Sequence, residues 1–352
     1  MRIAQIAPLF EAVPPKLYGG TERVVYSLTE ALVELGHDVT LFASGDSITS
    51  AKLAPMREQA LRLDPSVKDW LAYYVRMMEL VRRRADEFDV LHFHTDYFPL
   101  SLFGRQRTPF VSTLHGRLDL PEFKVVYETF LDAPFVSISD HQRRPIPRLN
   151  WVRTVHHGMP AELLKPQPGA QSYFAFLGRI SPEKGVDKAI RITAAAGAKL
   201  KIAAKIDAAD QQYWDEEIGP LVARSPHVEY IGEINDSQKP EFLSGAHALL
   251  FPIDWPEPFG LVMIEAMACG TPVIAFNRGS VPEVIDHGLS GFIVSDEAGA
   301  VAAIENLDRL DRRLVRQQFD RRFTATRMAE DYLDVYEEQI VGSRPLLRAV
   351  GD

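Results

Sequence analysis

Residues 1–43 read MRIAQIAPLFEAVPPKLYGGTERVVYSLTEALVELGHDVTLFA. Apolar residues 3–7 predict a short strand, and the loop after it is rich in proline and glycine and ends in Gly19-Gly20. From Thr21 onward, apolar residues recur at the spacing of a helix buried on one face, and residues 39–43 read as a second strand. This order of strand, helix and strand predicts a parallel sheet crossed by helices.

The same alternation continues through the rest of the chain. Further short apolar runs lie at residues 90–93, 110–114, 135–138 and 152–155, and then at 173–177, 200–204, 228–231, 248–251, 272–275 and 292–294. The stretch 158–169 holds three prolines and no sustained period, which is typical of a connection between domains.

We therefore predict an α/β protein with two doubly wound, Rossmann-like domains that face each other across a cleft. The first domain covers residues 1–164 and the second covers residues 165–324. A last helix at about residues 325–345 is expected to pack back on the first domain. Ligands of such sheets bind beyond the carboxyl ends of the strands, so motifs at strand ends carry the functional argument.

Composition and charge exclude several classes of function. The 352 residues hold 39 Lys and Arg against 48 Asp and Glu, and the net charge of −9 would repel a nucleic-acid backbone. Cys269 is the single cysteine, so a disulfide framework and a multi-cysteine metal cluster are excluded and a reducing, cytoplasmic location is expected. We expect neither a signal peptide nor a membrane-spanning helix.

Motifs of several other enzyme classes are absent. The sequence has no G-x-G spacing for a dinucleotide fingerprint and no G-K-[ST] for a P-loop. It also lacks D-x-D, G-x-S-x-G and H-E-x-x-H. We therefore expect no NAD-linked chemistry, no metal ion and no other cofactor.

The strongest positive signal is the stretch 256–270, PEPFGLVMIEAMACG. Glu257 lies in an extended loop, because a residue before proline is pushed out of the helical region. A helix expected to begin at about Phe259 or Gly260 offers unpaired N–H groups at its start. Glu265 is the only charged residue of that helix and should be hydrogen-bonded, since an unpartnered buried carboxylate is costly. Either glutamate alone could be structural, but their spacing at a strand end favours a ligand site.

A second signal is GRISPEKG at residues 178–185, directly after the strand that opens the second domain. Arg179 and Lys184 on this loop could clamp a diphosphate without a metal ion. The alternative is a pair of solvated loop charges, which this position in an acidic protein disfavours. Gly19-Gly20 is a weaker signal, because it could bring the backbone close to a ligand or simply form a turn.

Histidines end two strands of the first domain. His115, in Leu-His-Gly, could donate a hydrogen bond to a sugar or stabilise charge in the cleft, or it could be structural. His92, His94 and Asp96 line another strand end. We disfavour a metal site there, because no cysteine accompanies these residues and no supporting partner can be named. We expect His94 and Asp96 to contact an acceptor.

Basic residues also mix with aromatic ones in residues 66–84, and a second basic cluster contains Arg143, Arg144 and Arg148. Such clusters could hold a protein on anionic lipid. Acidic residues interrupt the first cluster, which favours a solvated helix face.

At these motifs the chain resembles the retaining nucleotide-sugar glycosyltransferases of family 4, which have the two-domain GT-B fold. Glu257 and Glu265 resemble the family's E-x7-E motif, and residues 178–185 resemble its diphosphate loop. Gly19-Gly20 is similar to its amino-terminal glycine loop, and residues 114–116 are similar to its cleft histidine motif. The resemblance covers nearly the whole chain.

The resemblance implies a role for each motif. Arg179 and Lys184 would bind the diphosphate, Glu265 the ribose and Glu257 the donor sugar, while His115 would lie near the anomeric carbon. The backbone N–H groups of Phe259, Gly260 and Leu261 would face the sugar and the phosphate.

The implied reaction is metal-independent transfer of a hexose from a UDP-sugar, or a GDP-sugar, to an acceptor hydroxyl with retention of configuration. The acceptor would be a small molecule or a glycan. His157-Gly158 departs from the family's usual Asn-Gly, and residues 251–255 replace its usual Pro-Ser, so the donor sugar stays open. A nucleotide-sugar epimerase of the same fold and a non-catalytic nucleotide-sugar binding protein are the alternatives.

Overall fold

The computed structural model describes residues 1–16 and 19–343. The chain divides into two compact units. Unit 1 contains residues 1–159 together with the chain from Ala325 onward, and unit 2 contains residues 160–324. The sequence places the domain boundary slightly later, at residues 164 and 165.

Unit 1 contains a seven-stranded sheet in the order β3-β2-β1-β4-β5-β6-β7, in which every paired strand is parallel to its neighbour. Its strands are β1 (Arg2–Ile6), β2 (Asp38–Ser44), β3 (Lys52–Arg57), β4 (Val90–Phe93), β5 (Phe110–Thr113), β6 (Phe135–Ser137) and β7 (Trp151–Thr154). Its helices are α1 (Gly20–Glu34), α2 (Leu71–Arg83), α3 (Leu100–Phe103), α4 (Pro121–Tyr127) and α13 (Ala325–Ser343).

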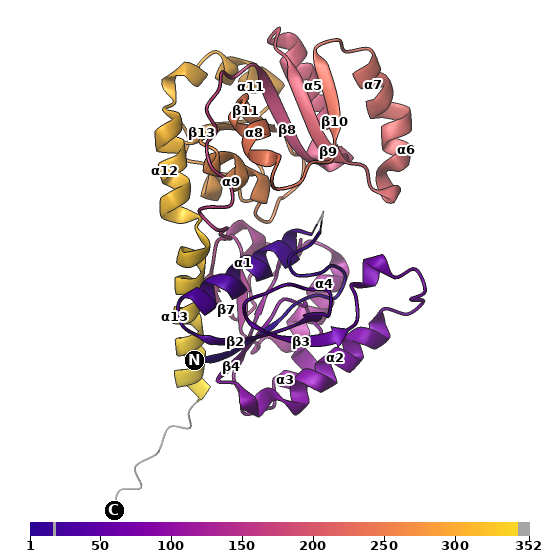
Figure 1. The fold of residues 1–352 in the computed structure, drawn as a ribbon, viewed down its shortest axis with the longest axis vertical. Coiled ribbons are helices and arrows are strands. Elements are labelled where there is room, and N and C mark those ends of the chain that lie inside the picture. Colours follow the sequence, from indigo (N-terminus) through magenta and orange to yellow (C-terminus); the bar gives the residue numbers. More distant parts are fainter. Residues whose placement is uncertain (17–18, 344–352) are drawn as a thin grey trace, which may run out of the picture. The chain divides into compact units, whose positions relative to one another are not determined.

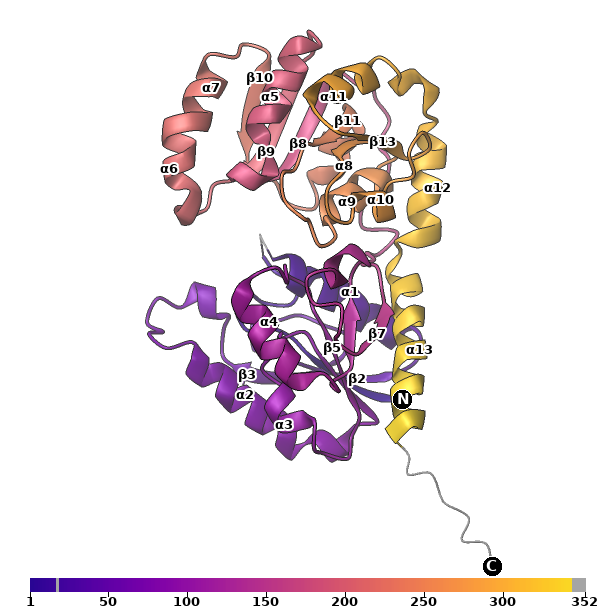
Figure 2. The ribbon, with the colours of Figure 1, turned by 180° about the vertical axis from the view of Figure 1, so that it is seen from behind.

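The two faces of this sheet bury different side chains, because successive residues of a strand point to opposite faces. Phe42 of β2 packs in the cluster that contains Met77 and Met78 of α2, whereas Leu41 packs with Val25 of α1. Helix α13 contacts α1, β4 and β5, so it covers the same face as α1 (Figures 1 and 2). The C-terminal helix therefore completes the core of unit 1.

Unit 2 contains a six-stranded parallel sheet in the order β10-β9-β8-β11-β12-β13. Its strands are β8 (Tyr173–Arg179), β9 (Leu200–Lys205), β10 (Val228–Gly232), β11 (Ala246–Phe251), β12 (Val273–Phe276) and β13 (Gly291–Val294). Its helices are α5 (Val186–Ala195), α6 (Gln211–Tyr213), α7 (Gly219–Ala223), α8 (Lys239–Ser244), α9 (Leu261–Ala268), α10 (Val281–Val284), α11 (Glu297–Ile304) and α12 (Arg312–Arg322).

The predicted fold class is confirmed, since both units are parallel α/β sheets wound in both directions from a central strand. Strand β3 was not predicted from the sequence. It contains Pro55, which cannot donate to a ladder, and it is tolerated because β3 lies at the sheet edge. Helix α13 ends at Ser343, and the last two residues of the predicted helix, 344 and 345, lie outside the described residues.

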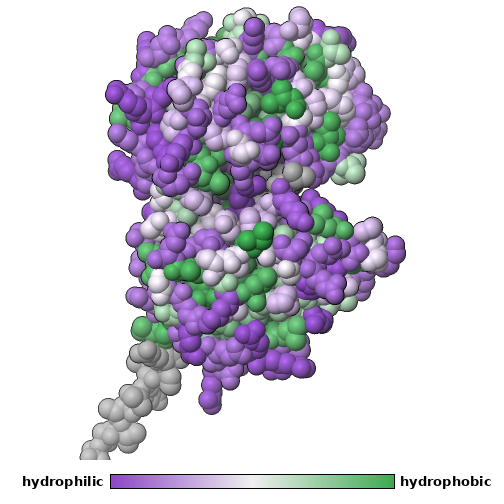
Figure 3. All heavy atoms as spheres, in the orientation of Figure 1, coloured by the Kyte–Doolittle hydropathy of each residue, from purple (hydrophilic) through white to green (hydrophobic). Residues whose placement is uncertain are grey.

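In the view of Figure 3, hydrophilic side chains prevail on both units and hydrophobic ones form small separate groups. On α2, Arg82 and Arg83 both bond to Glu79, so one carboxylate is shared by two of the basic side chains of this stretch. Within the described part of the chain, every helix is too short or too polar to cross a membrane.

Candidate active site

In unit 2, the predicted donor-binding loops meet at the point where the strand order reverses. Strands β8 and β11 are neighbours in the sheet, and the chain proceeds outward from them in opposite directions. Arg179 and Lys184 follow β8, and Glu257 follows β11. Loops at the carboxyl ends of such a pair of strands form the usual ligand crevice of an α/β sheet.

Lys184 and Glu257 are in direct contact. Lys184 Nζ donates a hydrogen bond of 2.5 Å to Glu257 Oε2, which also accepts one of 2.9 Å from Trp255 Nε1. The ammonium group lies 4.8 Å from the centre of the Trp255 ring. The Glu257 side chain is only 10% exposed, so this ion pair is shielded from water.

The backbone around Glu257 leaves no room for a side chain at Gly279. A Cβ atom there would lie 2.3 Å from the carbonyl oxygen of Glu257, and Gly279 has a φ of +55°. The neighbouring Ser280 N–H donates to the same Glu257 carbonyl at 3.0 Å. These contacts hold the Glu257 loop in one place.

Arg179 lies among three carboxylates. Its guanidinium is 2.7 Å from Glu183, 3.3 Å from Asp210 and 3.8 Å from Asp207. The two cations of this loop therefore face different acidic partners. A phosphate ligand would compete with these carboxylates for the same N–H donors.

Helix α9 begins directly after Gly260, which has the left-handed φ of +81°. The predicted start at Phe259 or Gly260 is therefore slightly early, because a residue with positive φ cannot belong to the helix. Phe259 is buried and packs edge to face against Phe323 at 6.1 Å. Leu261 is the first residue of the helix, where N–H groups have no intrahelical partner.

Glu265 is buried on α9, and its predicted hydrogen bond is confirmed. Its partner is Lys239 at the start of α8, whose Nζ lies 2.7 Å from Glu265 Oε1. Both side chains are nearly inaccessible, at 10% and 6% exposed. Sequence analysis missed Lys239, because nothing in the local pattern around it shows that this lysine is buried.

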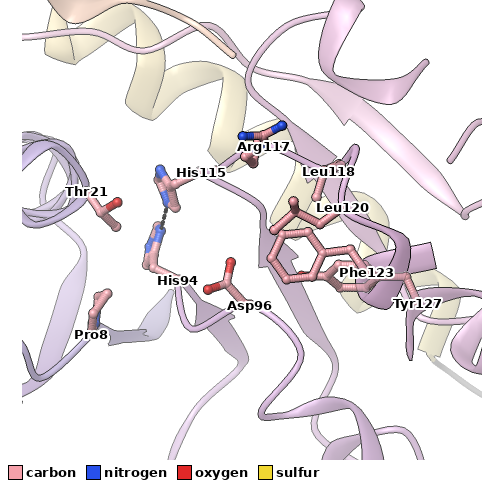
Figure 4. Close-up of a pocket in the computed structure, with 11 residues that line it drawn as sticks. Pro8, Thr21, His94, Asp96, His115, Arg117, Leu118, Leu120, Phe123 and Tyr127 are labelled. Carbon is pink, nitrogen blue, oxygen red and sulfur yellow. Dashed lines mark hydrogen bonds between the residues drawn. The ribbon is translucent and has the colours of Figure 1, made fainter. Parts of the chain in front are cut away.

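In unit 1, the strand order reverses between β1 and β4, and a pocket of about 280 Å³ opens at their carboxyl ends. Figure 4 shows His94, Asp96 and His115 on one side of it and the rings of Phe123 and Tyr127 on the other. The residues that line the pocket come from the loops after β1, β4 and β5 and from α1 and α4: Pro8, Thr21, His94, Asp96, His115, Gly116, Arg117, Leu118, Leu120, Phe123 and Tyr127.

The histidines of this pocket form a hydrogen-bonded pair. His94 Nδ1 lies 2.8 Å from His115 Nε2, and His94 Nε2 lies 2.8 Å from Gln5 Oε1. The ring of His157 stacks on His115 at 5.2 Å. Burial lowers the pKa of His115 to about 3 and that of His94 well below its usual range, so both imidazoles are neutral at physiological pH.

This geometry does not favour His94 as an acceptor-binding residue. Both of its ring nitrogens are already hydrogen-bonded, and the residue is buried. A bond from His94 to an acceptor would replace one of these contacts. In the folded chain His94 contacts the ring of His115, and its contact with an acceptor stays a prediction.

Asp96 lies beside the histidines with an unusual backbone. Its φ of 49° is the only positive φ of a non-glycine residue within residues 1–16 and 19–343. Residues in this conformation cluster at functional sites, where the surrounding structure enforces them. Asp96 is open to solvent, yet the protein around its carboxyl group removes enough water to raise its pKa to about 6.

Gly19 and Gly20 stand at the start of α1, which begins at Gly20 rather than at Thr21. A Cβ atom on Gly19 would lie 2.7 Å from Pro15 Cβ, so packing as well as ligand binding accounts for a glycine at position 19. Their role in donor binding stays a prediction. In the described part of the chain, no cluster of three or more His, Cys, Asp or Glu side chains could hold a metal ion.

Comparison with known proteins identifies the family. The model of glycosyltransferase family 4 matches residues 18–180, and the model of group 1 glycosyl transferases matches residues 165–319. The chain belongs to the family 4 glycosyltransferases. The predicted resemblance is thereby confirmed.

Relatives of this glycosyltransferase extend over most of its length. It is 27% identical to the phosphatidyl-myo-inositol mannosyltransferase of Mycolicibacterium smegmatis, covering 86% of this chain and 83% of the relative. It is 26% identical to the glycogen synthase of Mycobacterium tuberculosis, covering 91% and 92%. Its fold matches the crystal structure of AviGT4, a glycosyltransferase involved in avilamycin A biosynthesis, with a TM-score of 0.75, 24% identity and coverage of 97% and 98%.

Proposed function

We propose that this glycosyltransferase moves a hexose from a nucleoside diphosphate sugar to an acceptor hydroxyl with retention of configuration. The observation that carries the proposal is the Lys184–Glu257 contact at the strand-order reversal of unit 2. A cation there suits a phosphate, and a shielded carboxylate beside it suits sugar hydroxyls. The mannosyl transfer and glycogen synthesis named for the two relatives are also hexose transfers.

Different residues of unit 2 would bind different parts of the nucleotide sugar. Arg179 and Lys184 would hold the diphosphate, together with the N–H groups at the start of α9. Glu265 would accept from the ribose hydroxyls through the carboxylate that Lys239 orients. We propose UDP-glucose as the first donor to test and a GDP-sugar as the second.

The reaction would proceed on the front face of the donor sugar. The bond from the anomeric carbon to the diphosphate oxygen breaks, and the acceptor oxygen bonds to the same face of that carbon. The proton of the acceptor hydroxyl passes to the departing phosphate oxygen. Arg179, Lys184 and the dipole of α9 would stabilise the negative charge on the diphosphate, so the proposal needs no metal ion.

In this proposal, His115 of unit 1 lies near the anomeric carbon in its neutral form. It carries no charge that would repel the positive character developing on the anomeric carbon. Asp96 and the aromatic side of the unit 1 pocket would contact the acceptor, through hydrogen bonds from acceptor hydroxyls and through stacking on Phe123.

Product stereochemistry tests the proposal. We would incubate the protein with UDP-glucose and a panel of monosaccharide and glycan acceptors and record proton NMR of the first product. An α-linked product is expected, with unchanged yield in EDTA, and Glu257→Gln should abolish it. A β-linked product would overturn retention. Recovery of the donor sugar with one ring hydroxyl inverted, and with no transfer product, would favour an epimerase. Tight UDP binding without turnover would favour a binding protein.

A further inference from the structure

A buried layer of polar side chains lies between the sheet of unit 1 and α13. Gln5 of β1, His92 of β4 and Thr113 of β5 point to the face that α13 covers, and Tyr332 and Tyr336 come from the helix. All five side chains are at most 1% exposed. Apolar residues would fill this space at lower cost, because every buried polar atom needs a partner.

Hydrogen bonds join these five side chains into one network. Tyr336 OH lies 2.9 Å from Gln5 Nε2 and 2.7 Å from His92 Nδ1. His92 Nε2 lies 2.7 Å from Thr113 Oγ1, which lies 2.8 Å from Tyr332 OH. The other end of Gln5 faces His94, so the network continues from α13 to the His94–His115 pair.

The amide of Gln5 sets the direction of the hydrogen bonds toward His115. Gln5 Oε1 can only accept, so His94 Nε2 must carry a hydrogen. The neutral His94 ring then has a lone pair at Nδ1, which must accept from His115 Nε2–H. The neutral His115 ring is left with a lone pair at Nδ1.

The surroundings of His115 Nδ1 agree with this order. The atom is buried, and it has no hydrogen-bond partner in the structure. An unpartnered acceptor is tolerated better inside proteins than an unpartnered N–H group. The opposite order, with the Gln5 amide turned over, would put a hydrogen on this unpartnered nitrogen.

We infer that Gln5 and Tyr336 are positioning residues that hold His115 as its Nε2–H tautomer, so that the Nδ1 side of the ring carries a lone pair and no N–H group. The functional part of this inference rests on the proposed sugar transfer. Of the two functional roles that the sequence allowed for His115, this tautomer has no free N–H group for donating a hydrogen bond and is compatible with stabilising charge. A lone pair also suits a neighbouring carbon that gains positive character, whereas an N–H group would oppose it.

Tyr336 has a matched control on the same helix. Tyr336→Phe removes the hydroxyl that holds the Gln5 amide, whereas Tyr332→Phe removes a hydroxyl at the far end of the network. Each variant deletes one buried tyrosine oxygen from α13; Tyr336 loses two hydrogen-bond contacts and Tyr332 loses one. Both should therefore lose some stability, and only Tyr336→Phe should release the His115 tautomer.

The experiment is long-range proton–nitrogen NMR of the substrate-free protein with ¹⁵N-labelled histidine, in which His115→Gln assigns the His115 signals. Protonated and unprotonated ring nitrogens have well-separated ¹⁵N shifts. We expect the parent and Tyr332→Phe to show His115 with a hydrogen only on Nε2. In Tyr336→Phe and Gln5→Leu, both nitrogens should shift toward the average of the two tautomers.

A hydrogen on His115 Nδ1 in the parent would overturn the inference, and so would an unchanged His115 spectrum in folded Tyr336→Phe. No substrate is present in this measurement. Failure of transfer from both UDP-glucose and a GDP-sugar would therefore reject the proposed function while leaving the tautomer assignment intact. Transfer without the expected His115 spectrum would reject only the tautomer assignment.

Discussion

Lys239 and Glu265 form a buried ion pair in unit 2, with 2.7 Å between Nζ and Oε1. Lys239 is the first residue of α8, and Glu265 lies in the middle of α9. Removing one member of such a pair leaves a charge in the interior without compensation, which is far more costly than losing an exposed pair. Their contact therefore stabilises the fold of unit 2 and also orients the Glu265 carboxylate, which we propose binds the ribose.

We predict that Lys239→Met lowers the free energy of unfolding by about 3–5 kcal/mol. The double variant Lys239→Met with Glu265→Gln should recover most of the loss, because the buried carboxylate is gone and Asp236, the other carboxylate near Lys239, is 33% exposed. Lys188→Met is the control, since its partner Asp254 is half exposed and the pair should be worth less than about 1 kcal/mol. Urea unfolding measures all three, and equal losses in the two single variants would contradict the argument.

Arg179→Ala and Lys184→Ala should each weaken UDP binding about tenfold or more, because each removes charge-assisted hydrogen bonds to the diphosphate. The contribution of each cation to the binding free energy is a net value, since Arg179 and Lys184 both give up carboxylate partners when the ligand binds. Titration calorimetry with UDP measures the affinities. Lys201→Ala, which removes a lysine within β9, should bind like the parent. The clamp assignment fails if both loop variants also do so.

Asp96 should give the reaction an acidic limb in its pH profile. Its pKa of about 6 means that the carboxylate form is present above that pH and is lost as the pH falls through it. If this carboxylate binds the acceptor, kcat/KM should fall below about pH 6. Asp96→Asn should be slow at every pH and should lack this limb. An acidic limb that persists unchanged in Asp96→Asn would assign it to another group.

Glu22 should make unit 1 less stable as the pH rises. Burial raises the pKa of this side chain from 4.5 to about 7 in the folded protein. The folded state therefore binds the proton more tightly, and the stability linked to it is present below about pH 4.5 and lost as the pH rises to about 7. Glu22→Gln, which mimics the neutral acid, should raise the unfolding free energy by about 3 kcal/mol at about pH 8.

The same substitution should change little at about pH 4, where Glu22 is protonated in both states. Glu34→Gln is the matched control on the same helix, because its side chain is exposed. Urea unfolding at both pH values gives the comparison. A Glu22→Gln variant that is no more stable than the parent at high pH would show that burying the ionised Glu22 carboxylate does not lower the free energy of unfolding.

Local pattern was enough to predict the fold class and to single out the motifs of the candidate donor site. Strand and helix periods depend on residues a few positions apart, so β1, α1 and β2 could be predicted within one or two residues. The E-x7-E spacing is likewise local, because Glu257 and Glu265 flank the start of one helix. Strand β3 escaped prediction, since its proline reads as a strand breaker unless its edge position is known.

Partners that are distant in the sequence became visible only in the folded chain. Lys239 meets Glu265 across 26 positions and Gln5 meets Tyr336 across 331, and neither contact leaves a periodic trace in the sequence. A lysine in a polar stretch and a tyrosine on an amphipathic helix read as ordinary surface and core residues until the packing places them. The two hydrogen-bond partners of His94 could not be predicted for the same reason. Such a contact forms only within about 3 Å and depends on how β1, β4 and β5 lie beside one another.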